Sequence, residues 1–341
     1  MTGQRQGGLA TVEIDGGDRF QQHGKDTILR AALRAGVGFP YECSSGGCGS
    51  CKFELLDGEV DTLWADAPGL TPRDRQRRRH LACQCRALGH VRIKVRAAGE
   101  YVACVPPRRL NARLVGRSAL THDLHEFRFE SDGPAAFRPG QYAMLALPGV
   151  DAPRAYSMSN LPNAAAQWQF QIRRVPGGQA TSVLFDRLSV GSTVELDGPY
   201  GLAWLREDAA RDIVCIAGGS GLAPMIAIAR GAAAAGLLRQ RRLHFFYGAR
   251  TPADVCGEPL LAELPVFGST LRYLPVVSGD AAGWSGPTGF VHEAVERTLG
   301  AELAAHEFYF AGPPPMTQAV QDMLMVRHRV PYAQIHFDRF F

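Results

Sequence analysis

The sequence predicts a multidomain chain that combines an α+β part with an α/β part. Three observations carry this prediction: a loop rich in cysteine and glycine near the start, short alternating strands in the middle, and buried strands alternating with helices toward the end. At 341 residues the chain is long enough for two or three domains, each with its own core. We expect domains at 1–104, 105–205 and 206–341, with the proline pair of VPPRRL in the first linker.

Composition narrows the class of protein. Hydrophobic residues make up 46% and charged residues 21% of the chain, which are globular values, and the net charge of +4 is too small to indicate nucleic-acid binding. The most apolar stretch, 213–229, is broken by glycines and Pro224, which favours a buried strand, loop and helix over a membrane span. The opening residues lack the apolar core of a secretory signal. We therefore expect a cytoplasmic protein without a membrane or nucleic-acid partner, in which Cys104, Cys215 and Cys256 are ordinary thiols.

The first segment alternates short strands with one helix. Residues 1–8 are polar and glycine-rich, and we expect them to form a frayed terminus. The predicted elements after them are a strand at 11–15, a helix capped by Asp26 or Thr27 and ended by Gly36, a strand at 53–60 with Asp57 and Gly58 as its turn, and a closing strand at 91–97. The cysteine loop lies between this helix and the second strand.

The cysteine loop reads FPYECSSGGCGSCKFELLDGEV. Four and then two residues separate Cys43, Cys48 and Cys51, and Cys83 follows in LACQC. This is the plant-type spacing for a [2Fe–2S] cluster. The serines and glycines between the cysteines let the backbone wrap tightly, so that amide N–H groups can point at the sulfurs. Spacing alone leaves the fourth ligand open between Cys83 and Cys85.

Two other interpretations of the cysteines explain less. Zinc could use Cys48 and Cys51 together with Cys83 and Cys85, but it would leave Cys43 and the glycine–serine loop unexplained. A disulfide framework does not suit a long chain without a secretory context.

A run of arginines precedes the fourth cysteine. It could be a solvated helical turn, or it could help to dock an acidic redox partner near the cluster. Its members are Arg73, Arg75, Arg77, Arg78 and Arg79.

The middle segment carries strand patterns separated by turn residues, which predicts a small antiparallel barrel. Three motifs lie on it: RPGQY at 138–142, RAYSMSN at 154–160 and VPGGQATSVL at 175–184. The last one is a glycine turn followed by a helix start.

The final segment predicts a doubly wound parallel sheet. DIVCIAGGSGLAPM is a buried strand, a glycine loop and a helix start, and such a helix N-terminus can bind a pyrophosphate. LHFFYGAR, LRYLPVVS and EFYFAGPPPM repeat the strand-then-loop pattern. Ligands of such sheets bind at the carboxyl ends of the strands.

These motifs resemble known redox modules. The first segment resembles the β-grasp fold of plant-type ferredoxins, and this resemblance implies Cys83 as the fourth ligand. The middle and final segments resemble the FAD-binding and nicotinamide-dinucleotide domains of the ferredoxin–NADP reductase superfamily. Chance or strand packing could also produce the short R-x-Y-S pattern in isolation.

The resemblance implies roles for the barrel residues. Arg154 would balance flavin phosphate charge, Tyr156 would pack on the isoalloxazine, and Ser157 would hydrogen-bond the reactive ring nitrogen and so act in catalysis. The glycine turn would hold the pyrophosphate. The implied FAD-binding set is Arg154, Ala155, Tyr156, Ser157, Ile172, Gly178, Thr181 and Phe340.

The resemblance also implies a dinucleotide site. Its residues would be Gly218, Gly219, Ser220, Gly221, Arg250, Gly312 and Pro313. Many relatives have Cys-Gly-Pro-Pro where this chain has Ala311 before Gly312, so a thiol beside the nicotinamide is missing. We expect NADH rather than NADPH, because Arg250 and Thr251 are followed by Asp254 and no lysine, whereas a 2′-phosphate requires a cluster of cations.

The chain ends IHFDRFF. By resemblance Asp338 and Phe340 would act in catalysis, with Phe340 covering the flavin face that nicotinamide must reach. Alternatively, Phe337, Phe340 and Phe341 cap the core.

Taken together, the chain resembles the NADH-dependent reductase components of toluene-4-monooxygenase-type bacterial multicomponent monooxygenases. The resemblance implies a monomer that passes electrons from NADH through FAD and a [2Fe–2S] cluster to a Rieske-type ferredoxin or a hydroxylase component. A reductase of the same architecture could instead serve a Rieske dioxygenase or a deoxysugar dehydratase. A non-catalytic electron-carrier module is the remaining alternative.

Overall fold

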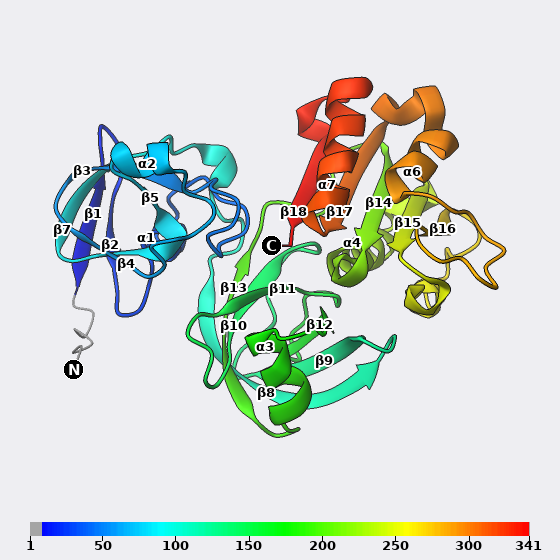
Figure 1. The fold of residues 1–341 in the computed structure, drawn as a ribbon, viewed down its shortest axis with the longest axis horizontal. Coiled ribbons are helices and arrows are strands. Elements are labelled where there is room, and N and C mark those ends of the chain that lie inside the picture. Colours follow the sequence, from blue (N-terminus) through cyan, green and yellow to red (C-terminus); the bar gives the residue numbers. More distant parts are fainter. Residues whose placement is uncertain (1–8, 341) are drawn as a thin grey trace. The chain divides into compact units, whose positions relative to one another are not determined.

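The computed structural model describes residues 9–340 (Figure 1). The chain divides after Arg108 into two compact units, of which the second contains both the barrel and the parallel sheet. The segments expected at residues 1–8 and at Phe341 lie outside the described residues.

The first unit has the predicted β-grasp fold. Its main sheet has the order β2-β1-β7-β3-β5, in which β1 pairs in parallel with β7, and helix α1 buries Ile28, Leu29 and Leu33. The elements are β1 (Ala10–Ile14), β2 (Arg19–Gln22), α1 (Ile28–Arg34), β3 (Lys52–Asp57), β4 (Val60–Thr62), α2 (Pro72–Gln76), β5 (Arg79–Leu81), β6 (Cys85–Ala87) and β7 (His90–Lys94).

Local contacts decide two details of this unit. The cap of α1 is Thr27, whose hydroxyl accepts the N–H of Arg30 at 3.4 Å, while Asp26 binds Arg34 instead. The turn at Gly58 does not close a hairpin between its neighbours, because β3 pairs with β5 and β7 whereas β4 pairs with β6. That turn carries the chain from the main sheet to a two-stranded one.

The predicted antiparallel barrel has the strand order β11-β10-β13-β8-β9-β12. A bridge between Met158 and Phe170 connects its two ends. Its core contains Phe127, Phe129 and Trp168. The strands are β8 (Arg108–Ala119), β9 (Leu124–Ser131), β10 (Tyr142–Ala146), β11 (Arg154–Ser157), β12 (Gln167–Arg173) and β13 (Thr193–Tyr200).

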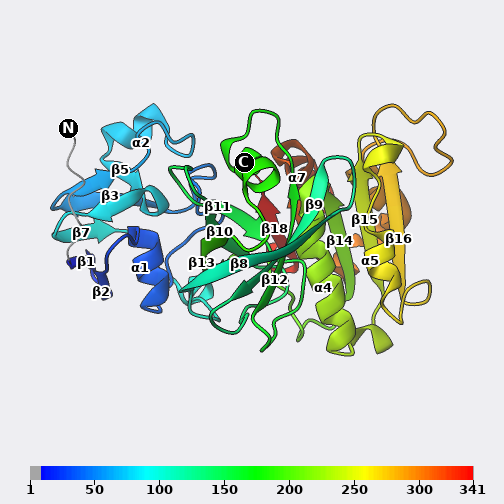
Figure 2. The same cartoon turned by 90° about the horizontal axis from the view of Figure 1, so that it is seen from below.

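The last part is the predicted doubly wound sheet, with the order β16-β15-β14-β17-β18 and parallel pairing throughout. Helices α4 and α5 cover one face, as Figure 2 shows, and α6 and α7 cover the other. The elements are β14 (Asp212–Gly218), α4 (Leu222–Ala234), β15 (Leu243–Ala249), α5 (Glu258–Ala262), β16 (Leu271–Val277), α6 (Val291–Leu299), β17 (His306–Gly312), α7 (Pro314–Gln321) and β18 (Ile335–Arg339).

Within residues 9–340, the helices are too short or too polar to cross a lipid bilayer.

Candidate cofactor sites

The cysteine loop and the turn after β5 bring four thiols together. Cys43, Cys48 and Cys51 lie between α1 and β3, and Cys83 lies in a 3₁₀ turn at Ala82–Gln84. The carbonyl of Cys51 accepts the N–H of Ala82 at 2.9 Å, which fixes the two segments side by side. The thiols interact in pairs, Cys43 with Cys48 and Cys51 with Cys83.

Backbone amides point at the sulfurs, as the serines and glycines of the loop predict. The N–H groups of Ser45 and Cys48 donate to Cys43 Sγ at 3.5 and 3.4 Å, and that of Ser50 donates to Cys48 Sγ at 3.4 Å. The neighbouring Cys48 thiol, together with the amides of Ser45 and Cys48, lowers the pKa of Cys43 against the opposing effect of burial. Iron binds thiolates, and its cluster sulfurs accept such N–H groups, so this donor set fits a [2Fe–2S] cluster.

Cys85 has different surroundings. It is 1% exposed on β6, its sulfur lies 3.8 Å from the hydroxyl of Thr62, and burial raises its pKa to about 12. Cys83 shares a side-chain hydrogen bond with Cys51, whereas Cys85 interacts with Cys51 only through a weaker electrostatic effect. These surroundings favour Cys83 as the fourth ligand, and the zinc alternative would leave out Cys43, which contacts Cys48.

The R-A-Y-S motif forms β11 at the end of the barrel sheet. Tyr156 packs partly against the barrel core, Ser157 is buried, and Arg154 donates to the carbonyl of Ala152 at 2.7 Å. Ala155, between them, is exposed. Strand alternation therefore puts Arg154 and Tyr156 on one face of β11.

The side chains of two other residues expected to bind FAD already make contacts with neighbouring parts of the barrel. The side chain of Ile172 packs in the barrel core. The hydroxyl of Thr181 stays within its own turn, where it contacts the N–H and carbonyl of Val175 and the carbonyl of Gly178. Helix α3 (Gln179–Ser182), which follows Gly178, continues directly into a π-helical turn at Val183–Arg187. Backbone N–H groups are therefore what the glycine turn can offer to a phosphate.

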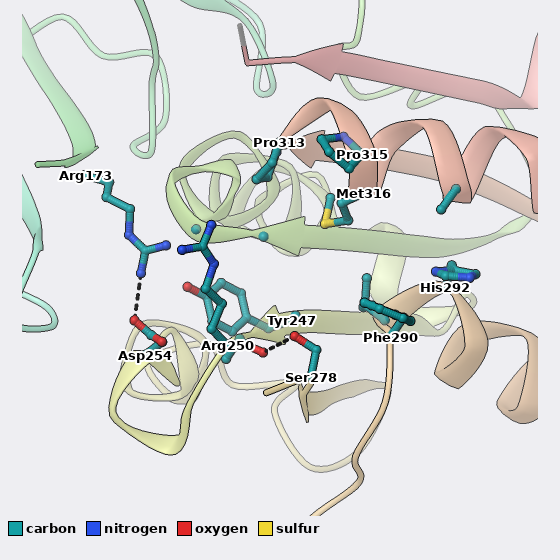
Figure 3. Close-up of a pocket in the computed structure, with 16 residues that line it drawn as sticks. Arg173, Tyr247, Arg250, Asp254, Ser278, Phe290, His292, Pro313, Pro315 and Met316 are labelled. Carbon is teal, nitrogen blue, oxygen red and sulfur yellow. Dashed lines mark hydrogen bonds and ion pairs between the residues drawn. The ribbon is translucent and has the colours of Figure 1, made fainter. Parts of the chain in front are cut away.

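A cavity of about 540 Å³ opens at the carboxyl ends of the parallel strands (Figure 3). Of the residues expected to bind the dinucleotide, Gly218, Gly219, Arg250 and Pro313 line it, and Ser220, Gly221 and Gly312 do not. Sequence reasoning missed several of its wall residues: Arg173, Tyr247, Asp254, Ser278, Phe290, His292 and Met316. The position of Tyr247 and Ser278 at the ends of predicted strands was the signal that could have identified them.

Glycine is required where the loop after β14 meets β17. A Cβ on Gly221 would lie 2.0 Å from the carbonyl oxygen of Ala311, and one on Gly218 would lie 2.6 Å from the sulfur of Met316. The loop therefore packs directly against the strand that ends at Gly312, and α4 starts beside the cavity.

Arg173 connects the barrel to the edge of the cavity. Its guanidinium lies 2.9 Å from a carboxylate oxygen of Asp123 and 2.9 Å from one of Asp254. Among the described residues, His122, Asp123 and Asp254 lie close enough together to hold a cation. The guanidinium of Arg173 already supplies positive charge beside these two carboxylates. The other oxygen of Asp254 accepts the N–H and hydroxyl of Thr251, so one carboxylate holds both Arg173 and the loop after β15.

The end of the chain packs onto the same region. Asp338 is buried on β18, and the N–H of Phe340 donates to the carbonyl of Gly312 at 3.0 Å. Phe340 packs partly against the apolar cluster on the α4 side, and Phe337 stacks on Phe310 with centroids 5.1 Å apart. These contacts give Phe337 and Phe340 a packing role.

Three family models match successive parts of the chain. They describe a 2Fe-2S iron-sulfur cluster binding domain at residues 12–88, an oxidoreductase FAD-binding domain at 111–204 and an oxidoreductase NAD-binding domain at 215–322.

Curated relatives are similar over almost the whole chain. The ferredoxin–NAD(P)(+) reductase CarAd of Metapseudomonas resinovorans is 45% identical over 92% of this chain and 94% of its own. The family is therefore clear. This chain belongs to the ferredoxin–NAD(P)(+) reductases of bacterial oxygenase systems.

Other members of this reductase family are also similar to this chain over nearly its whole length. The ferredoxin–NAD(+) reductase component of an alkene monooxygenase system from Xanthobacter autotrophicus is 40% identical over 96% of this chain and 100% of its own. The xylene/toluene monooxygenase electron transfer component of Pseudomonas putida is 34% identical over 97% and 94%. A solved structure of a ferredoxin reductase in carbazole 1,9a-dioxygenase is 40% identical and superposes with a TM-score of 0.89, covering 98% of this chain and 99% of that one. The reductase described here is thus an oxidoreductase with domains for a [2Fe–2S] cluster, FAD and NAD.

Proposed function

We propose that this reductase passes electrons from NADH, through FAD and a [2Fe–2S] cluster, to a Rieske-type ferredoxin or to the hydroxylase component of an aromatic-ring monooxygenase. The observation that carries the proposal is the presence of four gathered cysteines, a flavin-type barrel and a dinucleotide-sized cavity in one chain. The relative from a xylene/toluene monooxygenase supports this class of acceptor. A non-catalytic carrier is not favoured, because the chain has both the FAD-binding and the NAD-binding domain.

Each cofactor would be held by residues of one part of the chain. A bound FAD would supply the exchange between a two-electron hydride donor and a one-electron carrier, which the cluster would provide. Cys43, Cys48, Cys51 and Cys83 would hold the cluster. The amides that point at their sulfurs make the reduced, more negative cluster more stable. The matched family ranges fall within domains at 1–104, 105–205 and 206–341, which supports these boundaries.

The barrel strand β11 supplies the flavin contacts. Arg154 faces the phosphates, Tyr156 packs on the ring system and Ser157 hydrogen-bonds it. The shared face of Arg154 and Tyr156 supports this assignment. Asp338 and Phe340, at the end of β18, control access to the ring.

NADH occupies the cavity between the glycine loop and the start of α7. The glycine loop and the α4 N-terminus hold the pyrophosphate, because backbone N–H groups and the helix dipole favour an anion there. Among residues 9–340, Arg250 is the one cation in the cavity wall besides Arg173, which is already shared between two carboxylates. A lone arginine supports NADH as the substrate, since a 2′-phosphate is usually held by several donors.

A reductase serving a Rieske dioxygenase is the second candidate. The observation that favours it is the 40% identity to the ferredoxin reductase in carbazole 1,9a-dioxygenase. We expect a cytoplasmic monomer in either case, and sedimentation of the purified protein tests the monomer.

An anaerobic titration of the purified holoprotein, followed by absorbance, tests the proposal. NADH should bleach the flavin band and then the cluster band, and NADPH should do so only at much higher concentration. NADH oxidation should then be coupled to reduction of an added Rieske ferredoxin or hydroxylase. An unbleached flavin would refute the proposed function.

A further inference from the structure

Two large apolar side chains lie next to each other on the surface of the first unit. Leu63 and Trp64 follow β4, and their exposed fractions are 44% and 45%. Single exposed apolar residues are common, whereas adjacent large ones more often mark a contact with another molecule.

The indole of Trp64 lies on the cysteine loop. Its Cε3 and Cζ3 atoms are 3.1 and 3.3 Å from the position that a Cβ on Gly46 would occupy, and Gln84 Cγ is 3.2 Å from the same position. Gly46 lies between Cys43 and Cys48, and Gln84 directly follows the proposed fourth ligand. Trp64 therefore covers the place where the two sulfur-bearing segments meet.

The loop that carries Trp64 is attached at two points. The N–H of Gly69 donates to the carbonyl of Gly46 at 2.9 Å, which ties the loop to the cysteines. Arg75, on α2, approaches Asp66 to 3.5 Å, which ties the loop to the arginine run. The loop of the apolar pair and the helix that carries the arginines are thus joined at the surface of the first unit.

On this surface four exposed arginines, Arg73, Arg75, Arg77 and Arg78, outnumber Asp61 and Asp66, the exposed carboxylates beside the apolar pair. Arg73, Arg77 and Arg78 are exposed and make no ion pair with any residue in 9–340. Arg79 differs, because its guanidinium binds the carboxylate of Asp74 at 3.2 Å.

We propose that Leu63 and Trp64 form the apolar centre of a docking site for an acidic electron-acceptor protein, with the exposed arginines of α2 and its C-terminal end as the rim. The inference rests on the proposed function, and it deepens that function by naming the docking face and the charge of the partner. Electron-transfer contacts are small, and charge on the rim sets the rate of encounter. Tryptophan is one of the side chains enriched at the energetic centres of protein–protein contacts. A second copy of this chain fits less well, because two basic rims would repel each other.

The experiment uses the holoprotein, NADH and two haem proteins of opposite charge as acceptors, acidic cytochrome b5 and basic cytochrome c. Charge reversal by Arg73→Glu, Arg77→Glu and Arg78→Glu together should slow cytochrome b5 reduction about tenfold at low salt and should accelerate cytochrome c reduction. Trp64→Ala should raise the KM for cytochrome b5 several-fold. Leu88→Ala is the matched control, because Leu88 is 51% exposed on the same unit.

Two readouts separate the possible failures. Ferricyanide takes electrons from the flavin directly, so its reduction by NADH should stay unchanged in every variant, and the visible circular dichroism of the cluster should too. If the wild-type protein reduces no acceptor, the proposed function fails. A second outcome refutes the docking site alone. In it, the wild-type protein reduces both haem proteins, and the arginine variant either changes the two reduction rates by the same factor or leaves both unchanged. A change of sedimentation coefficient in Trp64→Ala would assign the surface to self-association and would likewise refute it.

Discussion

The guanidinium of Arg173 donates to the carboxylate of Asp254 at 2.9 Å, across 81 positions of the sequence. One residue ends a barrel strand, and the other lies in the loop that follows the second strand of the parallel sheet. A carboxylate of the barrel, Asp123, holds the same guanidinium. The ion pairs thus fix the loop after β15 against the barrel, at the edge of the cavity.

Replacing Arg173 by Met should raise the KM for NADH several-fold while lowering stability by about 1 kcal/mol, because these ion pairs are partly exposed. Arg173→Lys should recover stability better than KM, since an ammonium cannot reproduce the fork that reaches both carboxylates. Steady-state reduction of ferricyanide and thermal unfolding give the two quantities. Equal KM values in all three proteins would exclude the positioning role.

The two candidate cysteines should respond differently to the same change. Cys83→Ser should abolish the visible absorption of the cluster, because it removes a thiolate from the gathered set. Cys85→Ser should keep the cluster, and it should lower the stability of the fold only by the amount expected of a small buried substitution. Iron content and electron paramagnetic resonance of the reduced proteins measure the outcome. Cluster loss in Cys85→Ser with retention in Cys83→Ser would reverse the ligand assignment.

Gly221→Ala should impair both folding and NADH binding. The new methyl would lie 2.0 Å from the Ala311 oxygen, so the loop or β17 must shift, at a cost of about 1–3 kcal/mol. Gly99→Ala is the control, because a Cβ there meets nothing within 4 Å. Urea unfolding and NADH titration report the two effects. An unfolding free energy equal to that of the control would contradict the close approach.

Phe340→Ala tests whether the aromatic end acts on the reaction or only caps the core. Access to the flavin ring predicts a changed rate of flavin reduction by NADH with FAD content retained. A capping role predicts loss of FAD and a lowered Tm instead, because Phe340 packs on the apolar cluster beside α4. Stopped-flow absorbance and FAD content of the purified variant distinguish the two results.

Asp74 should make the first unit sensitive to acid. Its carboxylate binds Lys52 at 2.8 Å and Arg79 at 3.2 Å, and it accepts the N–H and the hydroxyl of Thr71, the cap residue of α2. The bond with Lys52, followed by those with Thr71 and Arg79, lowers the pKa of Asp74 far below its usual value. A group with a lowered pKa stabilises the fold above its unfolded pKa, and this contribution disappears as pH falls toward the folded value.

Asp74→Asn should therefore destabilise the protein by about 1–3 kcal/mol at pH 7. The difference from wild type should shrink as the pH falls below about 4, where the unfolded carboxyl becomes protonated. Thermal unfolding of both proteins between pH 3 and pH 7 measures it. A difference that stays constant over this range would show that the charge of Asp74 is not involved.

The sequence predicted those features that depend on neighbours in the chain. Cysteine spacing indicated the cluster loop because its ligands are local, and alternation indicated the strands because their faces repeat every second residue. The ion pair between Arg173 and Asp254 could not be predicted, since it depends on how the barrel packs against the parallel sheet. The same holds for the pairing of β4 with β6, which no property of the Asp57–Gly58 turn reveals.

The choice between Cys83 and Cys85 is a feature that the sequence pattern alone does not predict. Both follow β5 within a few residues, so pattern could not separate them without the resemblance. Their surroundings differ because the N–H of Ala82 donates to the carbonyl of Cys51 and brings Cys83 beside that cysteine, while Cys85 continues into β6. Only three-dimensional contacts supply that distinction.

The anchoring of α2 by Asp74 has a consequence for the kinetics of encounter. A five-residue helix would fray in isolation, but its capping box and its ties to β3 and β5 hold the backbone under the arginines in one conformation. A partner that meets this helix would restrict side chains alone, so little conformational entropy would be lost on each transient encounter. Fast association can then be combined with fast release, which is what a shuttle of single electrons requires of its docking site.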